Sequence, residues 1–213
     1  MRSLLLIGAL VLGIASVSAP VNAAGVRTFV RHEVTDYAAW RSVFDQSHGM
    51  QRKMGVSYTA VYQSTDNPND ITVVSDFKTE AKAKAFAASD ELKAAMQSAG
   101  VKGVPQVWFT RITPGASGKT GHVRMFVRHQ VSDYASWRRH YNEFQDTTGR
   151  HMGVMAQAVF RGTDDPNDIT VLHDFASDAK AKAFANSAEL KSAMQNSGVT
   201  GSPQVWFTAR AAK

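Results

Sequence analysis

Hydrophobic and polar residues alternate with a period of two from Val26 to Val34, which predicts a β-strand with one buried face. Tyr37, Trp40 and Phe44 then follow at helical spacing behind Asp36, whose short side chain can cap a helix. The expected elements of this first unit are strand 26–34, a helix capped at 35 or 36, strand 56–63, a turn at 65–70, strand 71–77, a helix from 79 that breaks at 89 and ends at Gly100, and strand 106–112. The order β-α-β-β-α-β is the split βαβ pattern.

The whole pattern occurs twice in the chain. The motif Val30-Arg31-His32 returns as Val127-Arg128-His129, and a residue inserted after it in the second copy brings Gly55 into correspondence with Gly153. A repeat of about 100 residues has the size of a small domain and is too long for a solenoid unit. We therefore expect two copies of one domain. The expected boundaries are 24–112 for the first copy, 113–121 for a linker rich in Gly, Ser and Thr, and 122–213 for the second copy.

The first 23 residues have the pattern of an export signal. Arg2 gives a positive start, Leu4–Val17 is apolar, and Val21-Asn22-Ala23 places small residues where an export peptidase reads them. The apolar run is shorter than the roughly 18–20 residues that span a bilayer as a helix, so no stable membrane anchor is expected. We predict that residues 1–23 are a removed signal peptide and that the mature protein is periplasmic or secreted.

Composition narrows the possible partners. The chain is 44% hydrophobic and 20% charged, as expected of a globular protein, and it has no cysteine, so neither a disulfide nor a thioether-linked lipid can stabilise or anchor it. The net charge of +6 would suit a nucleic-acid partner, but the lysines and arginines are scattered singly or in pairs. No nucleic-acid partner is expected.

Several motifs of each copy resemble a known superfamily. His-x-x-x-Asp-Tyr-x-x-Trp, a Pro-Asn-Asp turn, Ser-x-Glu-Leu-Lys and Pro-Gln-Val-Trp-Phe occur twice in this order. The chain resembles the dimeric α+β barrel superfamily, and within it the antibiotic biosynthesis monooxygenase-like group. The resemblance implies two ferredoxin-like α+β units that pair their sheets into a barrel, here as an intramolecular pseudo-dimer that could associate further into a homo-oligomer. Members include cofactor-independent quinol monooxygenases, haem-binding and haem-degrading enzymes, and isomerases.

Two histidines are the candidate chemical groups. On the first strand, His32 shares a face with Val30 and Val34, and we expect this face to lie beneath the helices. His129 is its counterpart in the second copy. A neutral imidazole there could accept a proton from a phenolic substrate, although a structural, hydrogen-bonded histidine is the competing interpretation. The candidate catalytic residues are thus His32 and His129, and the candidate ligand-binding residues are Trp40, Trp137, Tyr37 and Tyr134.

Metal and cofactor signals are weak. The acidic turns around Asp70 and Asp168 are too short for a calcium loop. His122, His140, His151 and His173 have no histidine counterparts in the first copy and form no ligand-spacing motif, so no metal site is expected. No organic cofactor is expected either, while haem, with His32 as an axial ligand, stays open as an alternative.

Three functional hypotheses follow. The first is a module that binds a small apolar or aromatic ligand in helix-covered cavities. The second is a cofactor-independent, monooxygenase-like enzyme in which His32 or His129 deprotonates a quinol-like substrate. The third is a non-catalytic envelope or stress scaffold. The absence of a defined catalytic set favours the first and third hypotheses over the second.

Overall fold

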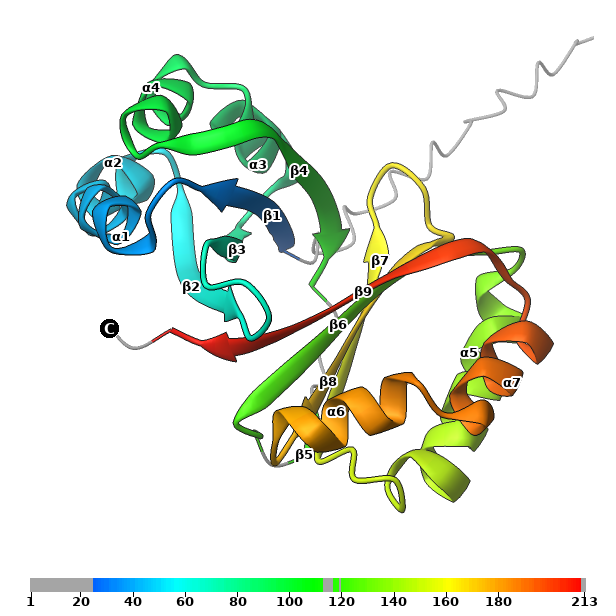
Figure 1. Cartoon of the computed structure of the whole chain (residues 1–213). Coiled ribbons are helices and arrows are strands. Elements are labelled where there is room, and N and C mark those ends of the chain that lie inside the picture. The colour runs from blue at the N-terminus through cyan, green and yellow to red at the C-terminus, as the bar shows by residue number, and fades with distance from the viewer. Residues whose placement is uncertain (1–24, 113–116, 119, 212–213) are drawn as a thin grey trace, which may run out of the picture.

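The computed structural model describes residues 25–112, 117–118 and 120–211 (Figure 1). The first copy contains β1 (Val26–Val34), α1 (Tyr37–Gln46), α2 (His48–Lys53), β2 (Val56–Ser64), β3 (Asp70–Phe77), α3 (Glu80–Ala87), α4 (Asp90–Ser98) and β4 (Val101–Arg111). The second copy contains β6 (Val123–Val131), α5 (Tyr134–Phe144), a π-helix η1 (Gln145–Gly149), β7 (Ala156–Gly162), β8 (Asp168–Phe175), α6 (Asp178–Ala185), α7 (Ala188–Asn196) and β9 (Val199–Arg210). The predicted α+β order is confirmed in both copies.

Side-chain caps set the helix starts where the sequence predicts them. The carboxylate of Asp36 accepts a hydrogen bond from the backbone N–H of Ala39 at 2.7 Å. Ser89 breaks the second helical segment as expected, since its hydroxyl accepts from the N–H of Leu92 at 3.2 Å and starts α4. Each cap satisfies an amide that the first helical turn would otherwise leave without a partner.

The strands form one closed sheet. Their order is β4-β1-β3-β2-β9-β6-β8-β7, and β7 also pairs with β4, which closes the barrel. The two seams between the copies are short: β2 pairs with β9 at Tyr62–Arg210, and β4 pairs with β7 at Thr110–Gly162. The helices of the first copy cover one side of the barrel and those of the second copy cover the opposite side (Figure 1). The chain is thus an intramolecular dimeric α+β barrel.

Two details differ from the sequence prediction. The last strand of the first copy begins at Val101, five residues before the predicted start, because Gly103 adopts a positive φ of 61° and lets the strand bulge and continue. Within the expected linker, Ser117–Gly118 forms a short strand, β5, that pairs with β7. The expected signal peptide and linker residues 113–116 and 119 lie outside the described residues.

The barrel interior is filled by aromatic side chains from both copies. Each copy's last strand supplies a tryptophan whose indole N–H crosses to the other copy: Trp108 donates to Thr170 at 2.9 Å and Trp206 donates to Thr72 at 3.0 Å. The buried interior set is Phe29, Ala60, Tyr62, Val74, Trp108, Phe126, Phe160, Leu172 and Trp206. Because both indole bonds are buried and reciprocal, they tie the two copies to each other.

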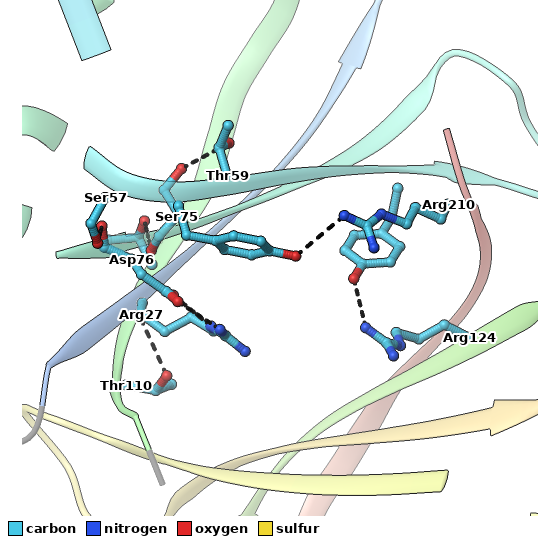
Figure 2. A network of polar contacts seen from close by, with 11 residues as sticks. Arg27, Ser57, Thr59, Ser75, Asp76, Thr110, Arg124 and Arg210 are labelled. Atoms are coloured by element: carbon cyan, nitrogen blue, oxygen red, sulfur yellow. Dashed lines mark hydrogen bonds and ion pairs between the residues drawn. The ribbon is translucent and has the colours of Figure 1, made fainter. Parts of the chain in front are cut away.

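Two arginines of the second copy add polar contacts to this interface. Figure 2 shows Arg27 paired with Asp76, and Arg124 and Arg210 reaching from the second copy toward tyrosines of the first. Arg124 donates to the Tyr62 hydroxyl at 2.6 Å and also forms a two-bonded ion pair with the buried carboxylate of Asp174. Planar guanidinium groups suit such two-bonded contacts.

The opposite face of the sheet lies beneath the helices, as predicted. Thr28, His32 and Val34 of β1 are buried on this side, whereas Phe29 points into the barrel. The rings of Trp108 and Phe109 also take opposite sides, as the alternation along a strand requires.

Across the described parts of the chain, no helix combines the length and apolar character needed to cross a membrane.

Candidate ligand site

A cavity lies between the sheet and the helices in each copy, and the two cavities occupy equivalent places. The first, of about 60 Å³, is lined by His32 and Trp40 together with Val30, Phe44 and Met96. The second, of about 40 Å³, is lined by the counterparts His129 and Trp137 together with Val127, Tyr141, Phe144, Gln145, His173 and Met194. The structure therefore brings each candidate histidine and tryptophan together at one cavity.

His32 is held at this cavity by the strand and the first helix. Its ring centroid lies 5.7 Å from that of Trp40, and only 6% of the residue is exposed. Neither ring nitrogen has a hydrogen-bond partner among the residues that the structure describes. Burial lowers the pKa of His32 to about 4, and the negative charge of Asp70 only partly opposes this effect. His32 is therefore neutral near pH 7, with one nitrogen donor and one acceptor to offer.

His129 repeats this environment. Its ring lies 5.5 Å from Trp137, and within the described part of the chain both of its nitrogens lack partners. Burial lowers its pKa to about 4, with a smaller opposing effect from Asp168. The structure buries both histidines, and this burial makes each imidazole less basic than an ordinary histidine, whose pKa is near 6.5.

A β-bulge opens the sheet beside each histidine. In the first copy, Arg31 faces Gln106 and Glu33 faces Lys102, so residues 103–105 of β4 bulge out opposite His32. In the second copy, residues 201–203 of β9 bulge in the same way opposite His129. Beside the first bulge, a polar hollow of about 450 Å³ includes His32 in its lining. His32 thus lies between the inner cavity and this outer hollow.

A surface groove adjoins the cavity of the first copy. The groove has a volume of about 370 Å³ and shares Thr28, Val30, Phe86, Leu92 and Met96 with the lining of the inner cavity. Its outer wall is formed by the bulged segment of β4, where Val104 is 93% exposed. Its size falls within the roughly 300–1,000 Å³ that is typical of small-molecule sites.

The second cavity contains a polar cluster that the sequence analysis missed. His173, from β8, lies with its Nε2 2.9 Å from the amide nitrogen of Gln145 and 3.0 Å from the hydroxyl of Tyr141. The same hydroxyl donates to the side-chain oxygen of Gln157 at 2.7 Å. The signal was available, because His173 falls on the same face of its strand as the buried Ile169.

Burial dominates the acid–base properties of this cluster. It lowers the pKa of His173 to about 3, and the nearby His129 lowers it further. Burial also raises the pKa of Tyr141 far above its ordinary value. Both groups are therefore neutral around pH 7.

Tyr37 and Tyr134 lie beside the sites and not at them. Each ring centroid is 5.9 Å from that of the neighbouring tryptophan, Trp40 or Trp137. Neither tyrosine belongs to the described lining of its cavity. Their proposed ligand contacts stay predictions.

The described residues do not fit a metal or haem at these positions. No group of three or more His, Asp or Glu side chains in the described ranges is arranged to hold a metal ion. The cavity at His32, about 60 Å³, is smaller than the roughly 150 Å³ cavity that accepts a benzene ring, and a porphyrin is several times larger than benzene. The inner cavity therefore has no room for a porphyrin bound to His32.

Comparison with known proteins agrees with the fold. Residues 26–98 match the family model described as antibiotic biosynthesis monooxygenase. No curated protein matches the chain in sequence.

Solved structures show the same architecture over most of the chain. An anthrone oxidase-like protein superposes with a TM-score of 0.65, 10% identity, and coverage of 89% of this chain and 92% of that one. A ferredoxin fold protein from Listeria monocytogenes, related to antibiotic biosynthesis monooxygenases, gives 0.52 and 10% identity, covering 90% and 98%. A monooxygenase-like protein from Listeria innocua gives 0.51 and 10% identity, with the same coverage. The first copy thus matches the antibiotic biosynthesis monooxygenase family model over residues 26–98, and the second copy repeats its fold to complete a dimeric α+β barrel within one chain.

Proposed function

We propose that the protein binds a small, mainly apolar ligand whose polar group forms a hydrogen bond with His32 or His129 beneath the helices. The observation that carries this proposal is that the ring nitrogens of both histidines are buried without partners among the described residues. A buried polar group without a partner costs roughly 1–3 kcal/mol. A hydroxyl or carbonyl group on a ligand would recover much of that free energy.

The first copy offers the more complete site. Its inner cavity of about 60 Å³ is too small for an aromatic ring, but the adjoining groove of about 370 Å³ is not. A ligand would lie with its apolar body against Phe86, Leu92 and Met96 and extend its polar group toward His32. Trp40 would form the wall next to that polar group.

Isothermal titration calorimetry with 3-phenylpropan-1-ol tests this proposal, because its hydroxyl lies at the end of a chain that extends beyond the ring. Its methyl ether is the analogue that lacks a donor. We expect saturable binding of the alcohol that His32→Leu weakens about three- to tenfold, the effect of one neutral hydrogen bond. The same substitution should change binding of the ether little. His151→Gln, at an exposed turn position, is the matched control. Unsaturable heats for both compounds, or equal affinities in the His32→Leu protein, would contradict the proposal.

The monooxygenase-like alternative has support from the family match and the fold. It requires His32 or His129 to remove a proton from a quinol-like substrate. A pKa of about 4 makes either imidazole roughly 300-fold less basic than an ordinary histidine, and general bases work best with a pKa near the working pH. Binding is therefore the better supported role. Oxygen uptake with hydroquinone, abolished by His32→Gln with His129→Gln in a folded protein, would favour the enzyme instead.

The scaffold alternative makes a different forecast. If the barrel only supports other contacts, substitutions of His32 or His129 should change stability and leave every small-molecule titration unchanged.

We also propose export of the mature chain, on the pattern of residues 1–23.

A further inference from the structure

One cross-strand pair beneath the helices is small in the first copy and large in the second. In the first copy, Thr28 of β1 faces Ser75 of β3, and both side chains line the inner cavity. In the second copy, the same positions hold Met125 of β6 and His173 of β8, which face each other in the same register and line the second cavity. All four residues are buried. The floor of the second cavity is therefore filled by larger side chains.

In the first copy this pair lies where the inner cavity adjoins the surface groove. Thr28 lines both spaces, and so does Phe86, whose ring reaches down from α3. The hydroxyl of Ser75 lies 3.4 Å from that of Thr59 on the neighbouring strand, so its short side chain stays close to the sheet (Figure 2). Protein interiors are otherwise closely packed, so space left beneath helices by two small residues is a distinct feature of this copy.

The corresponding space of the second copy is occupied. The ring of His173 packs against that of Phe184, the counterpart of Phe86, with the ring centroids 5.4 Å apart. Phe184 is only 1% exposed, and it is not part of the described lining of the second cavity. Leu190 is buried as well, whereas its counterpart Leu92 is half-buried and lines the groove. The helices α6 and α7 thus pack onto the larger pair at the place where the first copy has its groove.

Hydrogen bonds hold His173 in this position. Its Nε2 contacts the Gln145 amide of the π-helix and the hydroxyl of Tyr141, which donates to Gln157. The first copy has phenylalanine and threonine at the positions of Tyr141 and Gln157, so it cannot form this cluster. The cluster joins α5 and the π-helix to the strands β7 and β8, and it keeps the imidazole between the sheet and the helices.

We propose that the chain binds one ligand, in the first copy, and that this cross-strand pair decides which copy binds. Thr28 and Ser75 leave room for the ligand, whereas Met125 and His173 close the second site. The proposal rests on the proposed function for the nature of the site, and it adds the copy that binds and the residues that select it. His129 is then a structural residue, although its burial repeats that of His32.

The sizes of the spaces define the class of ligand. The inner cavity of the first copy, about 60 Å³, admits a short chain that ends in a polar group, and the groove of about 370 Å³ admits a ring. The second cavity, about 40 Å³, is smaller than the roughly 150 Å³ that accepts a benzene ring. An alcohol with a ring at the other end of a short chain therefore suits the first copy alone.

The test follows the two histidines separately in the whole protein. Histidine labelled with ¹³C gives one Cε1–H resonance for each ring, and His32→Gln and His129→Gln identify the two signals by their loss. In the parent protein, 3-phenylpropan-1-ol should shift the His32 signal to saturation and leave the His129 signal in place. Saturable shifts of both signals with similar affinity would overturn this proposal and leave the proposed function standing. A shift of neither signal would remove both.

Exchanging the pair in the first copy should close its site. Thr28→Met with Ser75→His should weaken binding at His32 about tenfold or more, because the added atoms fill the space that the ligand needs. Ser57→His, at an exposed position of β2, is the matched control and should leave the His32 shift unchanged. Undiminished binding after the exchange in a folded protein would overturn the proposal.

The reverse exchange should open the second copy. Met125→Thr with His173→Ser should add a saturable shift of the His129 signal to that of the His32 signal. Because the exchange removes buried hydrogen bonds, urea unfolding checks that the protein stays folded. If it does not, Met125→Thr with His173→Asn keeps a hydrogen-bonding partner for Gln145 and should give the same added shift. A folded variant of either kind whose His129 signal does not move would overturn the proposal.

Discussion

Because three histidines are buried, we expect this protein to lose stability at pH values above those at which carboxylates titrate. His32 and His129 have folded-state pKa values of about 4, and that of His173 is about 3, whereas an unfolded histidine titrates near 6.5. Protonation therefore favours the unfolded chain. The stability is complete above about pH 6.5 and is lost progressively as the pH falls from there toward 4.

The magnitude follows from the pKa differences. Between pH 7 and pH 5, each of these histidines costs the folded state roughly 2 kcal/mol, since the unfolded side chain gains most of a proton and the folded one does not. Three such groups together cost roughly 6 kcal/mol, a large part of the 5–15 kcal/mol that usually separates folded and unfolded states. Asp and Glu have ordinary pKa values near 4, so they contribute little in this window.

Urea unfolding followed by tryptophan fluorescence at pH 7 and pH 5 measures this loss. In His32→Gln the loss between the two pH values should be smaller by roughly 2 kcal/mol, because glutamine does not titrate. His129→Gln should behave in the same way. His151→Gln, at an exposed position, should lose as much stability as the parent protein. An equal free energy of unfolding at both pH values in the parent, or an equal loss in His32→Gln, would refute the reasoning.

Three further outcomes are expected. Thr72→Val and Thr170→Val each leave a buried indole N–H without its acceptor, and each should lower the free energy of unfolding by about 1–3 kcal/mol. In scanning calorimetry each lost kcal/mol should lower Tm by roughly 2–4 °C. The control Thr200→Val, at an exposed strand position, should stay within about 0.5 kcal/mol of the parent. The isolated first copy, residues 24–112, should dimerise or lose stability, because it leaves a sheet face uncovered; a stable monomer in sedimentation analysis would argue otherwise. N-terminal sequencing of the native protein should begin at Ala24, and an intact N-terminus in the cytoplasmic fraction would contradict export.

Local sequence patterns were enough to predict which side of the sheet each first-strand residue faces. Alternation placed His32 beneath the helices, and helical spacing placed Trp40 on the same side, so their contact could be expected. The early start of β4 was missed, because Gly103 and Pro105 look like a break between elements when the bulge is unknown. A bulge is defined by the pairing of two neighbouring strands, and the sequence of one strand does not show that pairing.

The strand pattern was enough to place His173 on the buried face, but its contact with Gln145 could not be predicted. His173 was set aside because the first copy has no histidine at that position, although that difference is what makes the second cavity distinct. The contact between Gln145 and His173 depends on the π-helix, whose register changes which side chains face the sheet. An insertion is visible in the sequence, but the helical form that absorbs it is not.

Some contacts across the barrel interior are the same in both directions: Arg31 lies 4.6 Å from the ring centre of Trp206, and Arg128 lies 4.7 Å from that of Trp108. A change in one copy at such a contact disturbs the other copy, and both copies keep arginine and tryptophan there. Other interior positions differ, since Tyr62 and Val74 of the first copy correspond to Phe160 and Leu172 of the second. Each helix-covered cavity is built almost entirely within its own copy, so His173 can arise without a matching change in the first. A homodimer of identical chains would carry two equal sites, and fusion into one chain is what permits two different ones.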